Sequence, residues 1–474
     1  MDLMVDKYNL SKQELRKMRR KKETIQAFAV FGVVVLIALV VLGGAGVGVY
    51  SLLHKQPQSD SELVQGTVGE AENETASDPV VEEPKETYPI VSQNSTPEEE
   101  GPIDRELTDE EKAEILDETI AVYINDMTIE QKVAGLFFIT PEELTGKTGI
   151  TIGDSTLNTA LSEYPVGGLL LTRDNMESTE QLKELIFNLK SVTGNELFIG
   201  VAETGGADSP FIVSGLKEAV ITGQREIGES GENSAAYTYG IAVGNLMNEY
   251  GFNTVIGPLA DIALQENGYT SGESFGNDPT QVKDMVRNAV RGVEDQNINT
   301  CVKFFPGYGD ITGNPASSRP TSSRTKEDIV EKDYPIYEDA IDGGADFIMV
   351  SQIAYSSITR DVPACLSSAV VTDMLRGELE YDGIVITDYL DTRSLIMHYK
   401  HADMAVMAIQ AGGDMLFCSG DFKKAYNGIL SAVERGDITE ERIDESLYRI
   451  YRVKYRNLVD YEGVAIQKGW LPEK

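Results

Sequence analysis

The 474-residue chain is poor in the side chains that most often bind metals or form covalent cross-links, since it has three histidines and three cysteines. The cysteines follow no paired spacing, which excludes a disulfide framework and a zinc site of the usual pattern. They are Cys301, Cys365 and Cys418. The histidines are His54, His398 and His401, so histidine-based chemistry has few positions to draw on.

Positive charge is also scarce, because 41 lysines and arginines stand against 77 aspartates and glutamates, a net charge of −36. Nucleic-acid backbones are bound by basic surfaces, so this balance disfavours a nucleic-acid partner. No Gly-x-Gly-x-x-Gly segment follows a predicted strand and opens a helix, so the usual sign of dinucleotide binding is missing. The hydrophobic share of 41% is ordinary for a globular protein.

Residues 27–53 form a run without charge that is long enough to span a bilayer, for which about 20 apolar residues suffice. Residues 1–26 are rich in lysine and arginine, whereas the flank after the run is nearly free of them. The positive-inside rule then predicts one transmembrane helix with a basic cytoplasmic tail, and places all later residues outside the cell. A cleaved signal peptide is the alternative, although the run exceeds a usual signal-peptide core.

Residues 54–105 change to a composition rich in Glu, Ser, Thr and Pro, with too few apolar side chains to support folding. We expect a disordered acidic linker there, either a spacer through a cell-wall layer or a tether with no spatial role. The predicted globular domain covers residues 106–460, and we expect residues 461–474 to form a C-terminal tail.

Within residues 106–460, short apolar runs rich in β-branched residues alternate with amphipathic segments of helical spacing. Eight such repeats over about 350 residues predict an α/β fold, and favour a (β/α)8 barrel of the TIM type over an open doubly wound sheet. The predicted strands are residues 135–140, 167–172, 197–203, 253–261, 300–307, 347–352, 383–388 and 415–419.

Polar residues stand within or at the carboxyl ends of several predicted strands, the end at which barrels of this type place their active sites. Two or more carboxylates at one rim suit glycoside hydrolysis, in which one attacks the anomeric carbon and another protonates the leaving oxygen. Alternatively, these side chains cap strands or pair with the lysine among them. They are Glu203, Asp261, Lys303, Gln352 and Asp388.

Several motifs between about residue 107 and residue 458 stand in an order that resembles the N-terminal domain of glycoside hydrolase family 3, in its bacterial β-N-acetylhexosaminidase branch. The resemblance implies a barrel and a retaining mechanism with a covalent glycosyl intermediate. The motifs are MTIEQKVAGLFFIT, YPVGGLLLTRDN, GFNTVIGPLADIA, SFGNDP, KFFPGYGD, GIVITDYLD and AVMAIQAGGDMLF.

The resemblance implies roles for four of the rim residues. The family's nucleophile is the aspartate after the seventh strand, and Asp388 in GIVITDYLD takes that position. Lys303 matches the lysine of the family's sugar-binding Lys-His-Phe-Pro-Gly segment. Asp261 matches the family's Pro-x-x-Asp aspartate, a rim or support residue, and Glu203 stands in a segment that corresponds to Asp-Gln-Glu-Gly-Gly but lacks its sugar-binding aspartate. We therefore expect Lys303, Asp261 and Glu203 to bind substrate, with no metal or organic cofactor.

The chain departs from the family pattern both in the sugar-binding subsite and at the acid/base positions. Phe304 and Tyr308 replace two histidines, and Glu273 replaces an arginine. The Asp-x-His acid/base pair of the branch, in the loop after the fifth strand, reads Asn314 and Ala316. Loss of the proton donor would lower the rate of hydrolysis by about 10²- to 10⁴-fold when the leaving group is an ordinary sugar alcohol.

The resemblance therefore leaves the acid/base residue unknown. Four carboxylates near the predicted rim are candidates for it. They are Asp310, Glu203, Glu273 and Asp391. The segment SSRPTSSRTKED is a further possible source of the acid, although Arg319 and Arg324 suggest that an anion or a carboxylate is bound there instead.

These observations leave more than one function open. The first is a hydrolase anchored at the cell membrane that removes β-linked N-acetylhexosamine residues from cell-wall glycans. The second is a catalytically silent barrel that binds glycan or a protein partner, suggested by the joint loss of the acid/base pair and of the subsite histidine and arginine. The third is a hydrolase of shifted specificity with a rebuilt subsite around Glu203, Glu273 and residues 310–325.

Overall fold

The computed structural model describes residues 105–193, 197–216 and 221–472. The predicted cytoplasmic tail (1–26), the transmembrane helix (27–53) and all but the last residue of the linker (54–105) lie outside the described residues and stay predictions. Among the helices that are described, none combines the length and the apolar character needed to cross a membrane.

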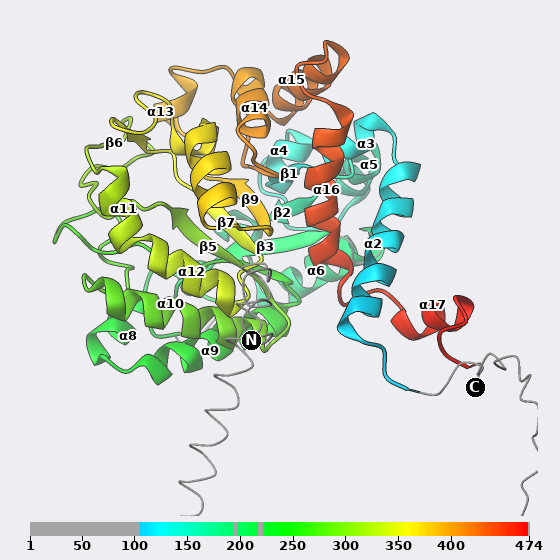
Figure 1. The fold of residues 1–474 in the computed structure, drawn as a ribbon, viewed down its shortest axis with the longest axis horizontal. Helices are drawn as coiled ribbons and strands as arrows, with labels where there is room; N and C mark the ends of the chain where they lie inside the picture. Colours follow the sequence, from blue (N-terminus) through cyan, green and yellow to red (C-terminus); the bar gives the residue numbers. More distant parts are fainter. Residues whose placement is uncertain (1–104, 194–196, 217–220, 473–474) are drawn as a thin grey trace, which may run out of the picture. The chain divides into compact units, whose positions relative to one another are not determined.

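The centre of the fold is an eight-stranded parallel sheet surrounded by helices (Figure 1). The strands follow one another in chain order from β1 to β9, and β10 pairs with the other edge of β1. All eight predicted strands are present, and each is shorter than expected. They are β1 (Phe137–Ile139), β2 (Gly168–Leu170), β3 (Phe198–Ala202), β4 (Thr254–Ile256), β5 (Asn299–Phe305), β7 (Phe347–Val350), β9 (Ile384–Thr387) and β10 (Leu416–Phe417).

The two ends of this sheet meet, so that the barrel is nearly closed. Ile386 of β9 bridges in parallel to Met415, which directly precedes β10. The Met415 N–H donates to the Val385 carbonyl at 3.1 Å, and the Met415 carbonyl accepts the Thr387 N–H at the same distance. A separate two-stranded sheet joins β6 (Thr321–Ser322) to β8 (Ala354–Tyr355). The predicted β/α barrel is confirmed at this level.

Helices cover the outside of the barrel because each presents one apolar face to the sheet. In α10 (Pro279–Glu294) the buried side chains recur every three or four residues, among them Val282, Val286 and Val293. The Asp278 side chain caps the start of this helix by accepting the Thr280 N–H.

The remaining helical elements are distributed along the whole described chain. They are α2 (Asp109–Asp126), α3 (Ile129–Ala134), α4 (Pro141–Thr145), α5 (Ser155–Glu163), η2 (Arg173–Asn175), α6 (Thr179–Thr193), α7 (Pro210–Val213), α8 (Gln224–Ser230), α9 (Asn233–Tyr250), α11 (Lys326–Lys332), α12 (Tyr334–Gly343), η3 (Ala364–Leu366), the π-helical η4 (Ala369–Glu378), α13 (Arg393–Ile396), α14 (His401–Gln410), α15 (Phe422–Glu434), α16 (Glu440–Tyr455) and α17 (Tyr461–Gln467).

The segment after residue 460 contains helix α17, which packs against α2. Ala465 and Leu471 form a small apolar cluster with Ile115 of α2. The Lys468 ammonium pairs with two glutamates of α2, at 3.1 and 2.9 Å; they are Glu114 and Glu118. The folded domain therefore extends through this helix, where the sequence suggested a tail, because apolar side chains of α17 cover the outer face of α2.

Buried ion pairs hold the amino ends of the last strands, opposite the carboxyl-end rim. Asp414 precedes β10 and is completely buried, and its carboxylate accepts the Val385 N–H at 2.9 Å. Asp346, before β7, pairs with Arg456 at 2.5 Å. Asp414 pairs with three arginines of η4 and α16, namely Arg376, Arg442 and Arg449. These pairs attach both helices to the barrel floor.

We expect Asp414→Asn to lower the free energy of unfolding by about 3–5 kcal/mol, because it leaves partly buried arginines without their carboxylate. Urea unfolding followed by circular dichroism measures the change. The matched control is Asp382→Asn, since the half-exposed Asp382 carboxylate pairs with Arg449 and Arg452 at the surface. We expect a loss below about 1 kcal/mol there. Equally small losses in both variants would contradict this account of Asp414.

Candidate functional site

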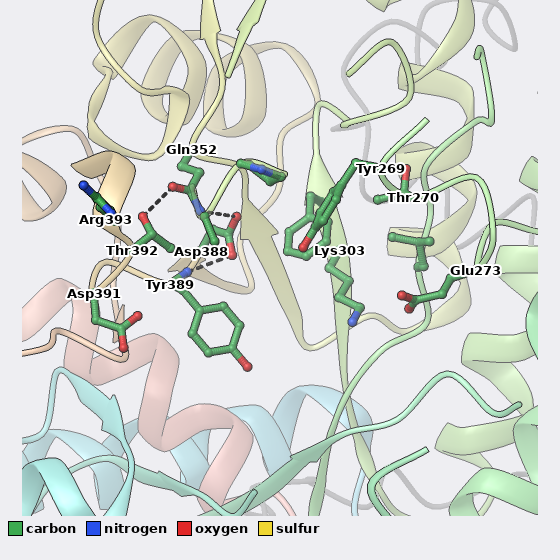
Figure 2. A pocket seen from close by; sticks show the side chains of 14 residues that line it. Tyr269, Thr270, Glu273, Lys303, Gln352, Asp388, Tyr389, Asp391, Thr392 and Arg393 are labelled. Atoms are coloured by element: carbon green, nitrogen blue, oxygen red, sulfur yellow. Dashed lines mark hydrogen bonds between the residues drawn. The ribbon is translucent and has the colours of Figure 1, made fainter. Parts of the chain in front are cut away.

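A cavity of about 520 Å³ opens at the carboxyl ends of the strands (Figure 2). The segments at the ends of β4, β5, β7 and β9 form its walls. The structure brings Lys303, Gln352 and Asp388 together there, three of the residues that the sequence placed at the rim. The full lining is Leu259, Tyr269, Thr270, Glu273, Lys303, Phe304, Pro315, Ala316, Gln352, Asp388, Tyr389, Asp391, Thr392 and Arg393.

Asp388 follows β9 directly and is 3% exposed. Its Oδ2 atom accepts hydrogen bonds from the Tyr308 hydroxyl at 2.5 Å and the Gln352 amide at 3.4 Å, and Oδ1 accepts the Tyr389 N–H at 2.8 Å. Burial raises the pKa of Asp388, and these three donors and the charge of Lys303 act against that rise. The negative charge of Asp388 therefore depends on hydrogen-bond donors.

Tyr308 stands at the position of a family histidine and is completely buried. Its hydroxyl donates to Asp388 and accepts the Gln352 N–H at 2.9 Å. Burial and the Asp388 charge keep the pKa of Tyr308 far above its usual value, so the phenol remains a donor. The Tyr308 N–H donates to Asp261 at 2.9 Å, which fixes the loop after β5.

Gln352 orients the same carboxylate from the end of β7. Its side-chain oxygen accepts the hydroxyls of Thr392 at 2.7 Å and Ser394 at 2.9 Å. With its oxygen occupied in this way, its amide N–H₂ group faces Asp388 (Figure 2). The segment after β9 and the end of β7 are thus joined around the carboxylate.

Asp261 and Glu203, expected to bind substrate, do not line the cavity. The Asp261 carboxylate accepts the backbone N–H groups of Phe304 and Tyr308, and burial raises its pKa to about 6. Glu203 is 1% exposed and accepts the Gly205 N–H and the hydroxyl of a loop serine, Ser209, both at 2.5 Å. The structure thus gives both carboxylates a supporting place, where the sequence suggested substrate contact.

Two of the four acid/base candidates reach the cavity, namely Glu273 and Asp391. Glu203 is enclosed by its own loop, as described above. Asp310 lies outside the lining, and its Oδ2 atom accepts the Ser322 hydroxyl at 2.6 Å. The structure therefore does not favour Asp310 or Glu203 as the proton donor, because neither carboxylate lines the cavity.

Arg324 binds carboxylates of the chain itself, one of the possibilities that the sequence left open for it. It is 9% exposed and pairs with Asp333 and, at 2.6 Å, with Asp328. Two carboxylates that follow it within nine residues already neutralise its charge. Arg319, the other arginine of that segment, does not line the cavity.

The loop that carries the acid/base pair in the family forms one wall of the cavity through Pro315 and Ala316. The Ala316 carbonyl accepts the Ser394 N–H at 3.4 Å, which joins this loop to the start of α13. Neither lining side chain can carry a proton, so this wall does not supply an acid.

Charged side chains lie on both sides of Asp388 in Figure 2, Lys303 and Glu273 on one side and Asp391 and Arg393 on the other. The Lys303 ammonium lies 5.5 Å from the centre of the Phe304 ring, a favourable cation–π distance. A small cavity with donors and acceptors of both charges suits a ligand that is rich in hydroxyl groups.

Glu143, in the short helix α4 that follows β1, is a carboxylate next to this cavity that the sequence did not single out. It accepts the N–H groups of Gly420 and Thr140. Burial and the negative charge of Asp391 raise the pKa of Glu143 to about 7. The strand-end rule that selected Asp388 could not find Glu143, because Glu143 lies within α4 and Asp388 follows β9 directly.

Residues 128–453 match the family described as glycosyl hydrolase family 3 N terminal domain. The chain belongs to this family. The match covers most of the described barrel, and it confirms the resemblance that the sequence motifs indicated.

Relatives of the chain carry hexosaminidase names. Beta-hexosaminidase A of Pseudoalteromonas piscicida is 24% identical over 345 residues, 66% of this chain and 57% of the relative. Beta-hexosaminidase of Chromobacterium violaceum is 25% identical over 54% of this chain and 72% of the relative. The structure of a family 3 β-N-acetylglucosaminidase from Paenibacillus sp. str. FPU-7 has a TM-score of 0.65 and 29% identity, over 70% of this chain and 63% of that one. The chain thus spans less than two thirds of the first relative and of the Paenibacillus structure.

We expect Tyr308→Phe to raise the pKa of Asp388, because the substitution removes a donor that stabilises the ionised form of a buried carboxylate. Asp388 would then become protonated at a higher pH than in the parent chain. A ¹³C NMR titration of labelled aspartate carboxyls measures this, with Asp388→Asn to assign the resonance. Tyr389→Phe is the control, since only the backbone N–H of Tyr389 contacts Asp388. An unchanged or lower pKa in Tyr308→Phe would contradict the assigned role.

Proposed function

We propose that the protein is a retaining, exo-acting glycoside hydrolase that removes β-linked N-acetylhexosamine residues from cell-wall glycans. The observation that supports this is the placement of Asp388. It stands at the family's nucleophile position, lines a cavity at the carboxyl-end rim of the barrel, and has its charge maintained by three donors.

In this proposal Oδ1 of Asp388 attacks the anomeric carbon. Oδ1 accepts only the Tyr389 N–H among the hydrogen bonds described, whereas Oδ2 accepts two side-chain donors. A carboxylate oxygen has two lone pairs, so Oδ1 keeps one for the sugar. The donors on Oδ2 fix the orientation of the carboxylate and stabilise its charge when the covalent intermediate breaks down.

The amino-sugar substrate is proposed from the names of the relatives, which are called beta-hexosaminidase and β-N-acetylglucosaminidase. The cavity fits a single sugar unit, since small-molecule sites usually measure about 300–1,000 Å³. Its lining offers the aromatic rings of Tyr269 and Tyr389 beside polar groups. The reaction needs carboxylates alone, so we propose no metal or organic cofactor.

The second candidate function is a silent barrel that binds glycan or a protein partner without turning it over. The observation that favours it is the cavity wall at Pro315 and Ala316, where the family has its proton donor. A site without any acid would bind a glycan but release an ordinary sugar alcohol slowly.

Hydrolysis of aryl glycosides tests the first function, because aryl leaving groups need little help from an acid. We expect the full chain to turn over 4-nitrophenyl β-N-acetylglucosaminide faster than the corresponding β-glucoside. Asp388→Asn should lower kcat by about 10⁴-fold or more, since it removes the nucleophile. Asp382→Asn, at the opposite end of the barrel, serves as the control and should retain activity.

Turnover by the parent chain that is no faster than that of Asp388→Asn would exclude the hydrolase. In that case calorimetry with cell-wall glycan fragments tests the silent barrel. Saturable binding without product release would support it.

We also propose that residues 27–53 anchor the chain in the cell membrane, with residues 1–26 in the cytosol and the barrel outside. The charge-free run and its basic flank support this. We expect the full chain to remain in the membrane fraction after alkaline carbonate extraction, and protease added to intact cells to digest the barrel. Recovery of the full chain in the soluble fraction, or protection of the barrel in intact cells, would contradict the proposal.

A further inference from the structure

The described lining of the cavity contains two carboxylates besides Asp388, namely Glu273 and Asp391. The wall that carries the proton donor in the family has only Pro315 and Ala316 to offer. We infer that Asp391 is the general acid/base of this site, an assignment that rests on the proposed hydrolase function.

The segment that carries Asp391 is held firmly against the loop after β10. The Leu390 N–H donates to the carbonyls of Phe417 and Cys418, both at 3.2 Å. A Cβ added at Gly420 would lie 3.0 Å from the Cβ of Asp391, so the two backbones are already in close contact. The Asp391 side chain itself is exposed and lines the cavity. Asp391 therefore lines the cavity from a fixed backbone position.

A second carboxylate, Glu143, contacts the same glycine from the other side of this loop. Its Oε1 atom accepts the Gly420 N–H, and its pKa of about 7 reflects burial and the negative charge of Asp391. Burial and this neighbouring negative charge let the Glu143 carboxyl keep its proton to a higher pH than an ordinary glutamate, and burial also raises the pKa of Asp391. The Asp391 side of the cavity thus has a local source of protons.

Glu273 is the other carboxylate that the cavity offers. It accepts the Thr204 hydroxyl at 3.0 Å and lies with Lys303 on the side of Asp388 opposite to Asp391 (Figure 2). The Glu273 carboxylate can accept hydrogen bonds from sugar hydroxyls, and the Lys303 ammonium can donate hydrogen bonds to them. Glu273 therefore provides a matched control, because it is also a carboxylate in the same cavity.

The proposed hydrolysis has two halves. In the first half, Asp388 forms a bond to the anomeric carbon while the bond from that carbon to the leaving oxygen breaks. The leaving oxygen keeps the electron pair of that bond and takes the proton of Asp391. In the second half, the ionised Asp391 takes a proton from water as the water oxygen bonds to the anomeric carbon and Asp388 is released. Both carboxyl groups return to their starting states.

The test compares Asp391→Asn with Glu273→Gln in the full chain, on aryl β-N-acetylglucosaminides whose leaving phenols differ in acidity. We expect Asp391→Asn to lower kcat/KM by about 10²–10⁴-fold for weakly acidic phenols and by less than about tenfold for 2,4-dinitrophenol. Glu273→Gln should lower kcat/KM by a similar factor for both kinds of leaving phenol, since it removes contacts to the sugar. With Asp391→Ala, added azide should restore turnover and yield a glycosyl azide of retained configuration.

Two results would overturn the assignment. One is an equal loss on both classes of phenol in Asp391→Asn, together with no azide product from Asp391→Ala. The other is a loss of kcat/KM that is larger for weakly acidic phenols in Glu273→Gln but not in Asp391→Asn. Thermal unfolding of each variant separates misfolding from lost chemistry, and the azide product identifies the acid/base even in a destabilised variant. Absence of turnover by the parent chain would instead reject the hydrolase function itself.

Discussion

The carboxyl-end rim of the barrel depends on keeping a negative charge at Asp388, a side chain that is 3% exposed. Burying a carboxylate is costly unless donors replace the lost water. Tyr308 supplies the closest donor, and Asp261 holds the backbone of Tyr308 in turn. Gln352 adds a donor from the end of β7. One hydrogen-bonded chain therefore connects the ends of β4, β5, β7 and β9, and it positions the cavity as a consequence.

The two ends of the barrel handle charge in different ways. On the floor, arginines neutralise the buried carboxylates of Asp414 and Asp346. At the rim, Lys303, Glu273 and Asp391 line the cavity, and none of the three forms an ion pair within 4 Å to another described residue. Neutralised charges hold helices to strands, whereas charges that face a cavity are available to a ligand. This division places stability at one end of the barrel and chemistry at the other.

Two departures from the family pattern, Tyr308 and Phe304, lie next to one another in space. Tyr308 replaces one family histidine, and its hydroxyl donates to Asp388. Phe304 replaces a second histidine, and its ring packs edge-on against the Tyr308 ring, with 4.9 Å between the centroids. Tyr269 packs against Tyr308 at 5.6 Å. An aromatic cluster thus shields the donor to Asp388 from water, which strengthens that hydrogen bond. This side of the cavity has lost its histidines, which agrees with a proton source on the opposite side.

The sequence by itself determined the eight strands, because buried parallel strands appear as continuous apolar runs, and it determined the rim position of Asp388 from the strand ends. The strand ends alone could not separate Asp388 from Glu203, since both are acidic residues at strand ends, and only the family motif singled out Asp388. Ser209 encloses Glu203, and Gly420, 277 residues away in the chain, contacts Glu143. A carboxylate acts according to the groups that hydrogen-bond to it, and loops far apart in sequence supply those groups. Only the tertiary structure therefore decided which carboxylates support the barrel and which face the cavity.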